Sequence, residues 1–187
     1  MAETPPQTAE SIQIVAYDPN WPQRYLAERA LVLQAIDPPF LAIEHVGSTA
    51  VPGLPAKPIV DMMAAVAVIG DGVAAIEALT TLGYQLIETG MPDRLFLRKH
   101  DRARACSFHL HIVDYASWPE RNERLLRDYL RAHPEAARAY GALKQQLAVA
   151  HAHNSLAYTK AKTAFIQSIV DRARDERGLP RVNVWEE

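Results

Sequence analysis

The spacing of hydrophobic residues changes near the middle of the chain. Up to about residue 115 the apolar runs are short, and several of them alternate with polar residues as β-strands do. From residue 118 onward, apolar residues recur every three or four positions, which is the spacing of amphipathic helices. A strand-rich part followed by a helical part indicates the α+β class, with a mixed sheet flanked by helices.

Six short strands are expected in the first part, over residues 12–16, 40–46, 59–69, 84–89, 95–99 and 107–113. The run 59–69 is nearly all apolar and has β-branched residues at its ends, which favours a central strand buried on both faces. The last two strands are separated by too few residues for a helical crossover, so we expect them to pair antiparallel.

Helices are expected over 21–36, over 73–82, in two segments after residue 118, and over about 159–177. Asn20 can cap the first helix, and Pro22 suits its first turn. Pro134 starts the second of the two segments after residue 118.

These elements predict one domain with a tail at each end. Residues 1–10 are polar and contain prolines, as in a loose tail. The domain covers 11–177, rich in strands over 11–115 and helical over 118–177. Residues 178–187 are expected to be irregular.

Composition limits the partners and the compartment. The chain has 187 residues, a formal net charge of −2 and a pI of about 6.4, without the basic excess of a nucleic-acid-binding protein. Its single cysteine, Cys106, excludes an intrachain disulfide and agrees with a reducing cytoplasm. No signal peptide or membrane-spanning run is present in the sequence. We expect a cytoplasmic protein with a small-molecule ligand and no membrane partner, and the oligomeric state stays open.

The most specific stretch is EHVGSTAVPGLPAKPIVDMM, at residues 44–63. A predicted strand ends in a Gly-Ser turn, and a second strand then presents Asp61. Gly47 allows the backbone to approach a ligand closely, and the N–H groups of the turn and the Ser48 hydroxyl can hold phosphate oxygens. A carboxylate on the adjacent strand can bind the Mg²⁺ or Mn²⁺ that accompanies phosphates. Nucleotidyl transfer needs both features.

This stretch resembles the signature of the GrpB family, also called UPF0157. Four further pieces resemble the family and occur in the same order, namely YDPNW, FHLHIV, RDYLRAHPEAARAYGALK and YTKAKTAFI. Together they cover about residues 12–175. The resemblance implies a fold of the nucleotidyltransferase superfamily, whose pattern is Gly-Ser, a spacer, and two acids two positions apart on a strand. Some family members are fused to dephospho-coenzyme A kinase, which suggests nucleotide or coenzyme A chemistry by association.

The sequence departs from the superfamily pattern at the second acid. Met63 occupies that position, and a thioether does not bind Mg²⁺, which prefers hard oxygen ligands. The candidates nearest to the usual third acid are His109 and His111, which share one face of their strand. We therefore assign catalytic roles to Asp61, His109 and His111, with Asp61 as the metal ligand. A site of two histidines and one carboxylate is the alternative.

Five further residues are candidates for binding phosphate or substrate. Tyr158 and Lys162 are expected on one helical face, and Lys144 follows a tyrosine by four positions in the preceding helix. A lysine at the edge of an apolar face either extends its amine to solvent or binds a buried anion. Lys57 and Arg98 can pair either with the ligand or with Asp61 as a structural acid.

Two polar residues precede the Gly-Ser turn. Glu44 and His45 are neighbours on one strand and project to opposite faces, so one of them is expected to face the same cleft as Asp61. The sequence does not decide which.

The function that these features favour is transfer of a nucleotidyl group from a nucleoside triphosphate to a small acceptor. A binder of nucleotides or acidic metabolites that has lost catalysis is the alternative, and Met63 supports it. Another small-molecule transferase or ligase on the same fold is a third possibility.

Overall fold

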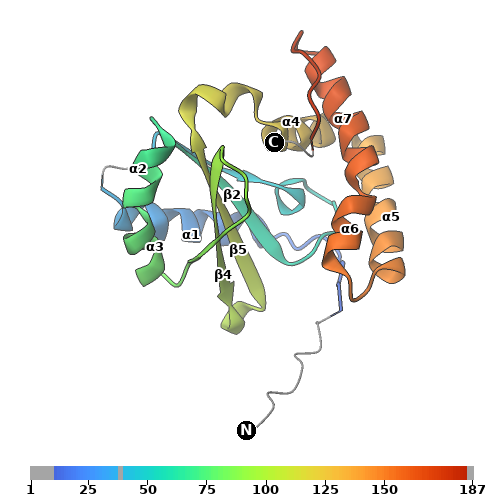
Figure 1. The fold of residues 1–187 in the computed structure, drawn as a ribbon. Coiled ribbons are helices and arrows are strands. Elements are labelled where there is room, and N and C mark those ends of the chain that lie inside the picture. Colours follow the sequence, from blue (N-terminus) through green and yellow to red (C-terminus); the bar gives the residue numbers. More distant parts are fainter. Residues whose placement is uncertain (1–10, 38–39, 185–187) are drawn as a thin grey trace, which may run out of the picture.

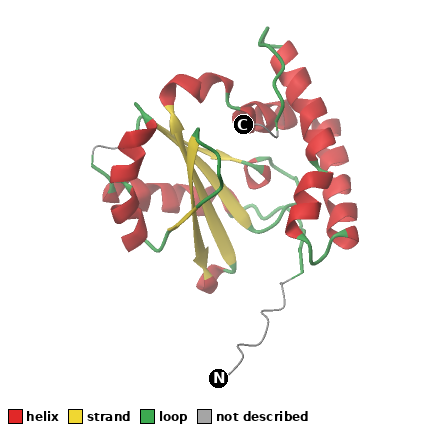
Figure 2. Ribbon diagram, in the orientation of Figure 1, coloured by secondary structure: helices red, strands yellow, loops and turns green. Residues whose placement is uncertain are grey.

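The computed structural model describes residues 11–37 and 40–184, which form a five-stranded sheet with helices on both faces (Figure 1, Figure 2). The strands are β1 (Ala42–Val46), β2 (Ile59–Val66), β3 (Gln85–Ile87), β4 (Arg94–Asp101) and β5 (Cys106–Asp114). Their order is β1-β2-β5-β4-β3; β2 and β5 are parallel, and the other neighbours are antiparallel. The expected α+β class and the antiparallel pairing of β4 with β5 are confirmed.

The helices fall into two groups. They are α1 (Trp21–Ala35), α2 (Ile69–Ala74), α3 (Ile76–Thr81), α4 (Asn122–Ala132), α5 (Pro134–Ala150), α6 (Ser155–Ala161) and α7 (Thr163–Asp175). Figure 1 shows α1, α2 and α3 on one side of the sheet and α4 to α7 on the other. Short 3₁₀ turns follow β1 at Ser48–Ala50, β4 at Arg102–Arg104 and β5 at Tyr115–Glu120.

Side chains alternate along β2 between these two faces. Val60, Met62 and Ala64 are fully buried in the main hydrophobic core with α1 and α3. Asp61 and Met63 project to the opposite face, toward the helical part. Met63 is fully buried in a small separate core, whereas the Asp61 side chain is 26% exposed. A polar position and an apolar position thus lie next to each other on the same face.

A charged cluster anchors the helical part to this face. Glu44 on β1 accepts hydrogen bonds from Arg124 at 3.0 Å and from Arg127 at 2.6 Å, and both arginines belong to α4. Arg127 also donates to the backbone carbonyl of His45 at 2.9 Å. Because Arg127 is buried, the carboxylate that neutralises it fixes the position of α4 over the edge strand.

Several predicted elements differ from the structure. Residues 12–16 form only one isolated bridge, between Val15 and Ala56, because the segment lies outside the sheet. The helix predicted over 73–82 is two helices, beginning at Ile69 and interrupted at Ala75. The helix predicted over 159–177 is also two. It begins at Ser155, where the Asn154 side chain accepts from the Ala157 N–H at 2.9 Å, and it is interrupted at Lys162.

The predicted cap of α1 is also wrong. Asn20 has helical backbone angles and does not cap the helix with its side chain. Asp18 accepts the backbone N–H of Asn20 at 2.8 Å instead, since a carboxylate two residues earlier reaches that donor. The predicted tail over 1–10 lies outside the described residues.

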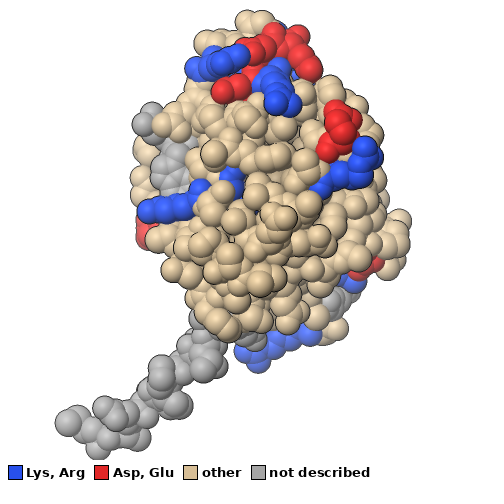
Figure 3. All heavy atoms as spheres, turned by 90° about the vertical axis from the view of Figure 1, so that its right-hand side faces the viewer, with Lys and Arg blue, Asp and Glu red and all other residues tan. Residues whose placement is uncertain are grey.

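Among the described residues, no helix is long and apolar enough to cross a membrane. On the face of the molecule shown in Figure 3, Lys and Arg side chains are scattered and lie beside Asp and Glu.

Candidate functional site

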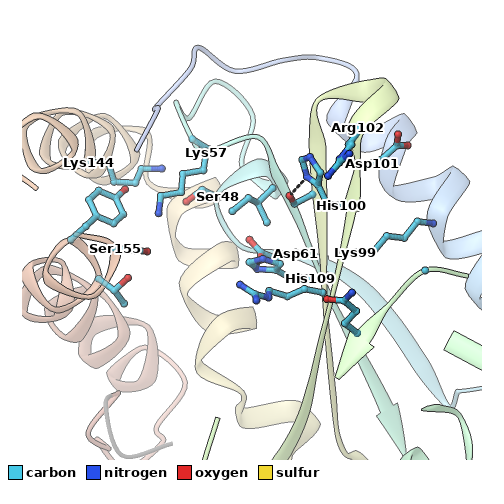
Figure 4. Close-up of a pocket in the computed structure, with 18 of the residues that line it drawn as sticks. Ser48, Lys57, Asp61, Lys99, His100, Asp101, Arg102, His109, Lys144 and Ser155 are labelled. Carbon is cyan, nitrogen blue, oxygen red and sulfur yellow. Dashed lines mark hydrogen bonds and ion pairs between the residues drawn. The ribbon is translucent and has the colours of Figure 1, made fainter. Parts of the chain in front are cut away.

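A large polar cleft lies between the sheet and the helical part, with a volume of about 1110 Å³. Its walls come from the loop after β1, from β2, β3, β4 and β5, and from α5 and α6. Eight of the ten site residues expected from the sequence line it: Ser48, Lys57, Asp61, Arg98, His109, Lys144, Tyr158 and Lys162. Figure 4 shows Asp61 and His109 between Lys57, Lys144 and Ser155 on one side and Lys99, His100 and Arg102 on the other.

Gly47 does not line the cleft itself but packs against Asp61, which does. Its φ of +70° and ψ of −172° lie in a region that only glycine adopts easily. A Cβ at this position would overlap Asp61 Oδ2 and would lie 2.9 Å from Asp61 Cγ. The glycine is therefore required twice, by its backbone conformation and by the carboxylate that packs against it.

Asp61 and His109 form the centre of the cleft. They are register neighbours on the parallel strands β2 and β5, and His109 Nδ1 lies 3.1 Å from Asp61 Oδ1. The Phe96 ring contacts the His109 ring edge-on, with ring centres 5.1 Å apart. With Nδ1 donating to Asp61, the neutral imidazole has its acceptor lone pair on Nε2. This pair has the arrangement of a general base oriented by a carboxylate.

Two lysines flank one tyrosine at the helical wall. The Nζ atoms of Lys57 and Lys162 each lie 4.4 Å from the centre of the Tyr158 ring, which is buried. Lys162 occupies the interruption between α6 and α7, and this break directs its amine into the cleft. The ring face gives both ammonium groups a favourable contact without neutralising them.

Lys144 approaches the cleft from α5. Its side chain is 2% exposed, its Nζ donates to the Pro55 carbonyl at 2.5 Å, and it lies 4.7 Å from the Tyr140 ring centre. The Tyr140 hydroxyl forms a hydrogen bond with Ser48 in the Gly-Ser turn. Helix α5 is thus joined to both ends of the loop that carries the phosphate-binding pattern.

Burial of these amines lowers their affinity for protons. Burial, reinforced by the charge of Lys162, lowers the pKa of Lys144 to about 7. Burial and the charge of Lys57 lower the pKa of Lys162 to about 8. The pKa of Lys57 is lowered by burial as well. Asp61 acts in the opposite direction on all three, but one carboxylate does not balance three amines, so the cleft favours an anionic ligand.

The structure does not bring His111 into the cleft. His111 lies one row further along the sheet, beside Met63, and its ring stacks on Phe96 with centres 4.8 Å apart. Its Nδ1 is buried and has no hydrogen-bond partner among the described residues. Burial lowers the pKa of His111 to about 4, so the ring is neutral near pH 7.

Neither residue before the Gly-Ser turn lines the cleft. Glu44 is on the same face of the sheet as Asp61, but the arginines of α4 hold its carboxylate. His45 is on the other face, where its ring stacks on Tyr25 and its Nε2 lies 2.9 Å from Thr49 Oγ1.

The protein offers few ligands for a metal ion. Within residues 11–37 and 40–184, no three His, Cys, Asp or Glu side chains lie close enough together to hold one. The alternative site of two histidines and one carboxylate is therefore not formed. Asp61 is the carboxylate beside the Gly-Ser turn, and its Oδ2 is the oxygen on the side of Gly47.

Sequence reasoning missed several residues of the cleft. Ser155 and Thr159 line it from the same face of α6 as Tyr158 and Lys162. Their spacing of three, four and seven positions was visible in the sequence, but the helix had been predicted to begin only at Thr159. Gln85 was also missed, because the opposite wall is assembled from β3, β4 and β5 and has no local motif.

The chain is similar to proteins of one family over most of its length. A profile described as "GrpB protein" matches residues 11–172. The chain belongs to the GrpB family. A UPF0157 protein of Pseudomonas aeruginosa is 37% identical over 171 residues, which are 88% of this chain and 68% of that protein. A dephospho-CoA kinase of Mycolicibacterium paratuberculosis is 28% identical, and the match covers 88% of this chain and 46% of that longer protein.

Solved structures agree with the family and with the superfamily fold. GrpB from Enterococcus faecalis is 32% identical, with a TM-score of 0.79 over 89% of this chain and 99% of that chain. The Cid1 poly(U) polymerase, in a structure with Mg 3′-dATP bound, is 15% identical, with a TM-score of 0.54 over 80% of this chain and 50% of that chain. At 15% identity the likeness shows a nucleotidyltransferase-like fold and nothing further.

Replacement of Gly47 tests the contact with Asp61. Gly47→Ala should cost more stability than Gly53→Ala, because both positions have positive φ but a Cβ at Gly53 meets no atom within 4 Å. Backbone strain alone costs about 1–2 kcal/mol, and overlap with the Asp61 carboxylate adds to it. Urea unfolding of the two variants measures the difference. Equal losses of stability would mean that Asp61 moves away without cost.

The buried lysines predict how the stability of the ligand-free protein depends on pH. Since Lys144 and Lys162 lose their protons at a lower pH in the fold than in the unfolded chain, unfolding takes up protons between about pH 7 and 10. The free energy of unfolding should rise from about pH 7 to 8.5, by at most about 1.4 kcal/mol per pH unit for each lysine. Denaturant unfolding across this range measures the rise. Lys144→Met should flatten it, and a fall in stability in the natural protein would contradict the buried charges.

Proposed function

We propose that the cleft binds a nucleoside triphosphate with Mg²⁺ or Mn²⁺ and transfers its nucleotidyl group to a small acceptor. The observation that carries this proposal is that Lys57, Lys144 and Lys162, all partly or fully buried, line the same cleft as Asp61 and Ser48. The nucleotidyltransferase-like fold supports it. Small-molecule chemistry is favoured over a nucleic-acid partner because the net charge of the chain is −2.

A bound triphosphate would offset the unfavourable free energy of keeping these lysines protonated while partly buried. Burial disfavours the protonated form of each amine. Phosphate oxygens would favour the protonated form again, because they accept strong hydrogen bonds from the ammonium group. Lys57, Lys144 and Lys162 would bind the β- and γ-phosphates. The Gly47–Ser48 turn would hold the oxygens nearer to Asp61, through its backbone N–H groups and the Ser48 hydroxyl, since Ser48 lines the cleft.

The metal ion would be shared between protein and nucleotide. Asp61 supplies a hard oxygen ligand of the kind Mg²⁺ prefers, and the phosphates would supply others. Asp61 Oδ1 is next to His109, so Oδ2, on the side of Gly47, would take the metal. The ion would neutralise phosphate charge in the transition state.

The chain's own residues supply the remaining roles in the reaction. The hydroxyl or amine of the acceptor would form a bond to the α-phosphorus while the bond to the bridging oxygen breaks and pyrophosphate leaves toward the lysines. The acceptor's proton would pass to Nε2 of His109, whose Nδ1 is oriented by Asp61.

A non-catalytic binder of nucleotides or acidic metabolites is the second candidate, and the environment of Met63 favours it. This residue stands where the superfamily has a second acid, and it is fully buried among Val46, Ala65, Val113 and Trp118. A cleft with Met63 in place of a second acid beside Asp61 can retain the phosphate site after losing the transfer step.

Calorimetry and a turnover assay separate the two candidates. Mg²⁺ alone should bind weakly, since Met63 replaces a second acid beside Asp61, and it should bind together with a nucleoside triphosphate. Asp61→Asn should remove the gain that the metal gives to nucleotide binding. Release of pyrophosphate in the presence of mixed small acceptors supports transfer, and binding without release supports the second candidate. Tight Mg²⁺ binding to the protein without nucleotide would contradict a metal ion shared between Asp61 and the phosphates.

Lys162 should contribute directly to nucleotide affinity. Lys162→Met keeps the apolar stem but removes the charge, so it should weaken binding of the triphosphate by about 1–3 kcal/mol with little loss of stability. The matched control is Lys160→Met, since Lys160 is exposed in the last turn of α6, two positions before Lys162, and does not line the cleft. Unchanged affinity together with lost stability would mean that Lys162 has a structural role.

A further inference from the structure

The cleft extends to both sides of the Asp61–His109 pair. Lys57, Lys144 and Lys162 lie at the helical end, where the proposed triphosphate binds. The opposite end lies over β3, β4 and the turn after β4, and Arg102 marks it in Figure 4. The volume of about 1110 Å³ exceeds the range of about 300–1,000 Å³ for single-ligand pockets. The space is sufficient for a second small molecule beside the nucleotide.

A single row of polar residues crosses the sheet at the centre of the cleft. Asp61 on β2 pairs in register with His109 on β5. His109 pairs in turn with Arg98 on β4, and Arg98 pairs with Gln85 on β3. Register partners project from the same face with Cβ atoms about 5 Å apart. Arg98 and Gln85 therefore follow His109 directly, on the side away from the Gly47–Ser48 turn and from the lysines.

Arg98 is available for a ligand. Its side chain is exposed, and it forms no hydrogen bond or ion pair within the described part of the chain. The neighbouring Lys99 differs, because Glu28 holds its Nζ at 2.7 Å. His100 differs as well, since its Nδ1 lies 3.0 Å from Ser107 Oγ. A solvated surface arginine is the ordinary explanation of such exposure, but Arg98 lines the cleft and adjoins His109 in the row.

We propose that Arg98 and Gln85 form the acceptor subsite, and that the acceptor is a small molecule with a carboxylate or phosphate group as well as its nucleophilic hydroxyl or amine. This inference rests on the proposed function. The planar guanidinium of Arg98 binds either anion through two parallel hydrogen bonds, and the Gln85 amide adds a donor and an acceptor. An acceptor anchored there presents its nucleophile to His109, the next residue in the row. The sequence had grouped Arg98 with the phosphate-binding lysines.

Three related probes test the charge requirement. Glycerol 3-phosphate, glycerate and uncharged glycerol are titrated calorimetrically into protein saturated with Mg²⁺ and α,β-methylene ATP, which cannot transfer its nucleotidyl group. At least one anionic probe should bind beside the nucleotide, and glycerol should not. Comparison of the two anions tells whether the site prefers phosphate or carboxylate.

Three variants locate the probe. Arg98→Met should weaken probe binding about tenfold or more, as expected for loss of a charge-assisted bidentate contact, and should leave the affinity for the nucleotide almost unchanged. Lys162→Met should weaken nucleotide binding and leave probe binding almost unchanged. Arg172→Met is the matched control, since Arg172 is exposed on α7 and does not line the cleft.

Two results would overturn the acceptor subsite. One is that neither anionic probe binds to the nucleotide-saturated protein. The other is that Arg98→Met weakens the nucleotide as much as Lys162→Met does, because Arg98 would then belong to the triphosphate site. Failure of the proposed function gives a different result. If α,β-methylene ATP does not bind but the probes bind the free protein in a manner that depends on Arg98, the anion subsite stands and nucleotidyl transfer is excluded.

Discussion

The contact between Gly47 and the Asp61 carboxylate is the constraint on which the cleft depends. Val46 and Asp61 are register partners on β1 and β2, so the chain that leaves β1 must pass directly over the Asp61 side chain. Only a residue without a Cβ, at a φ of +70°, fits there. The close approach fixes one carboxylate oxygen beside the turn and leaves the other 3.1 Å from His109. The Gly47–Ser48 turn, Asp61 and His109 are therefore packed together as one unit.

The helical part supplies the charge that this unit lacks. Lys144 comes from α5 and Lys162 from the break between α6 and α7, and both amines have a lowered pKa because the fold buries them. The ion pairs of Glu44 with the α4 arginines hold these helices against the sheet. The ligand-free protein therefore carries an unfavourable cluster of like charges, which a polyanion would relieve.

The sheet face that borders the cleft changes from polar to apolar between one row of residues and the next. Asp61 and His109 border the cleft, but in the next row Met63 is sealed in a small apolar core and His111 stacks on Phe96. A second acid at position 63 would have to be buried in this apolar core, which is unfavourable for a carboxylate. The single-carboxylate site and the packing of the helical part on the sheet are thus two aspects of one arrangement.

The sequence by itself determined the class of the fold. It placed both ends of four of the five strands to within about two residues. Of the ten site residues that it predicts, eight line the cleft. It succeeded there because period, turn chemistry and the EHVGSTAVPGLPAKP motif are local properties. Only the tertiary structure decided that His111 is excluded from the cleft and that the Glu44 carboxylate is held by the arginines of α4. It also decided that Arg98 lies on the far side of His109 from the lysines. These outcomes depend on strand order and helix packing, which bring together residues far apart in the sequence, such as Glu44 and Arg127, and leave no periodic pattern in the chain.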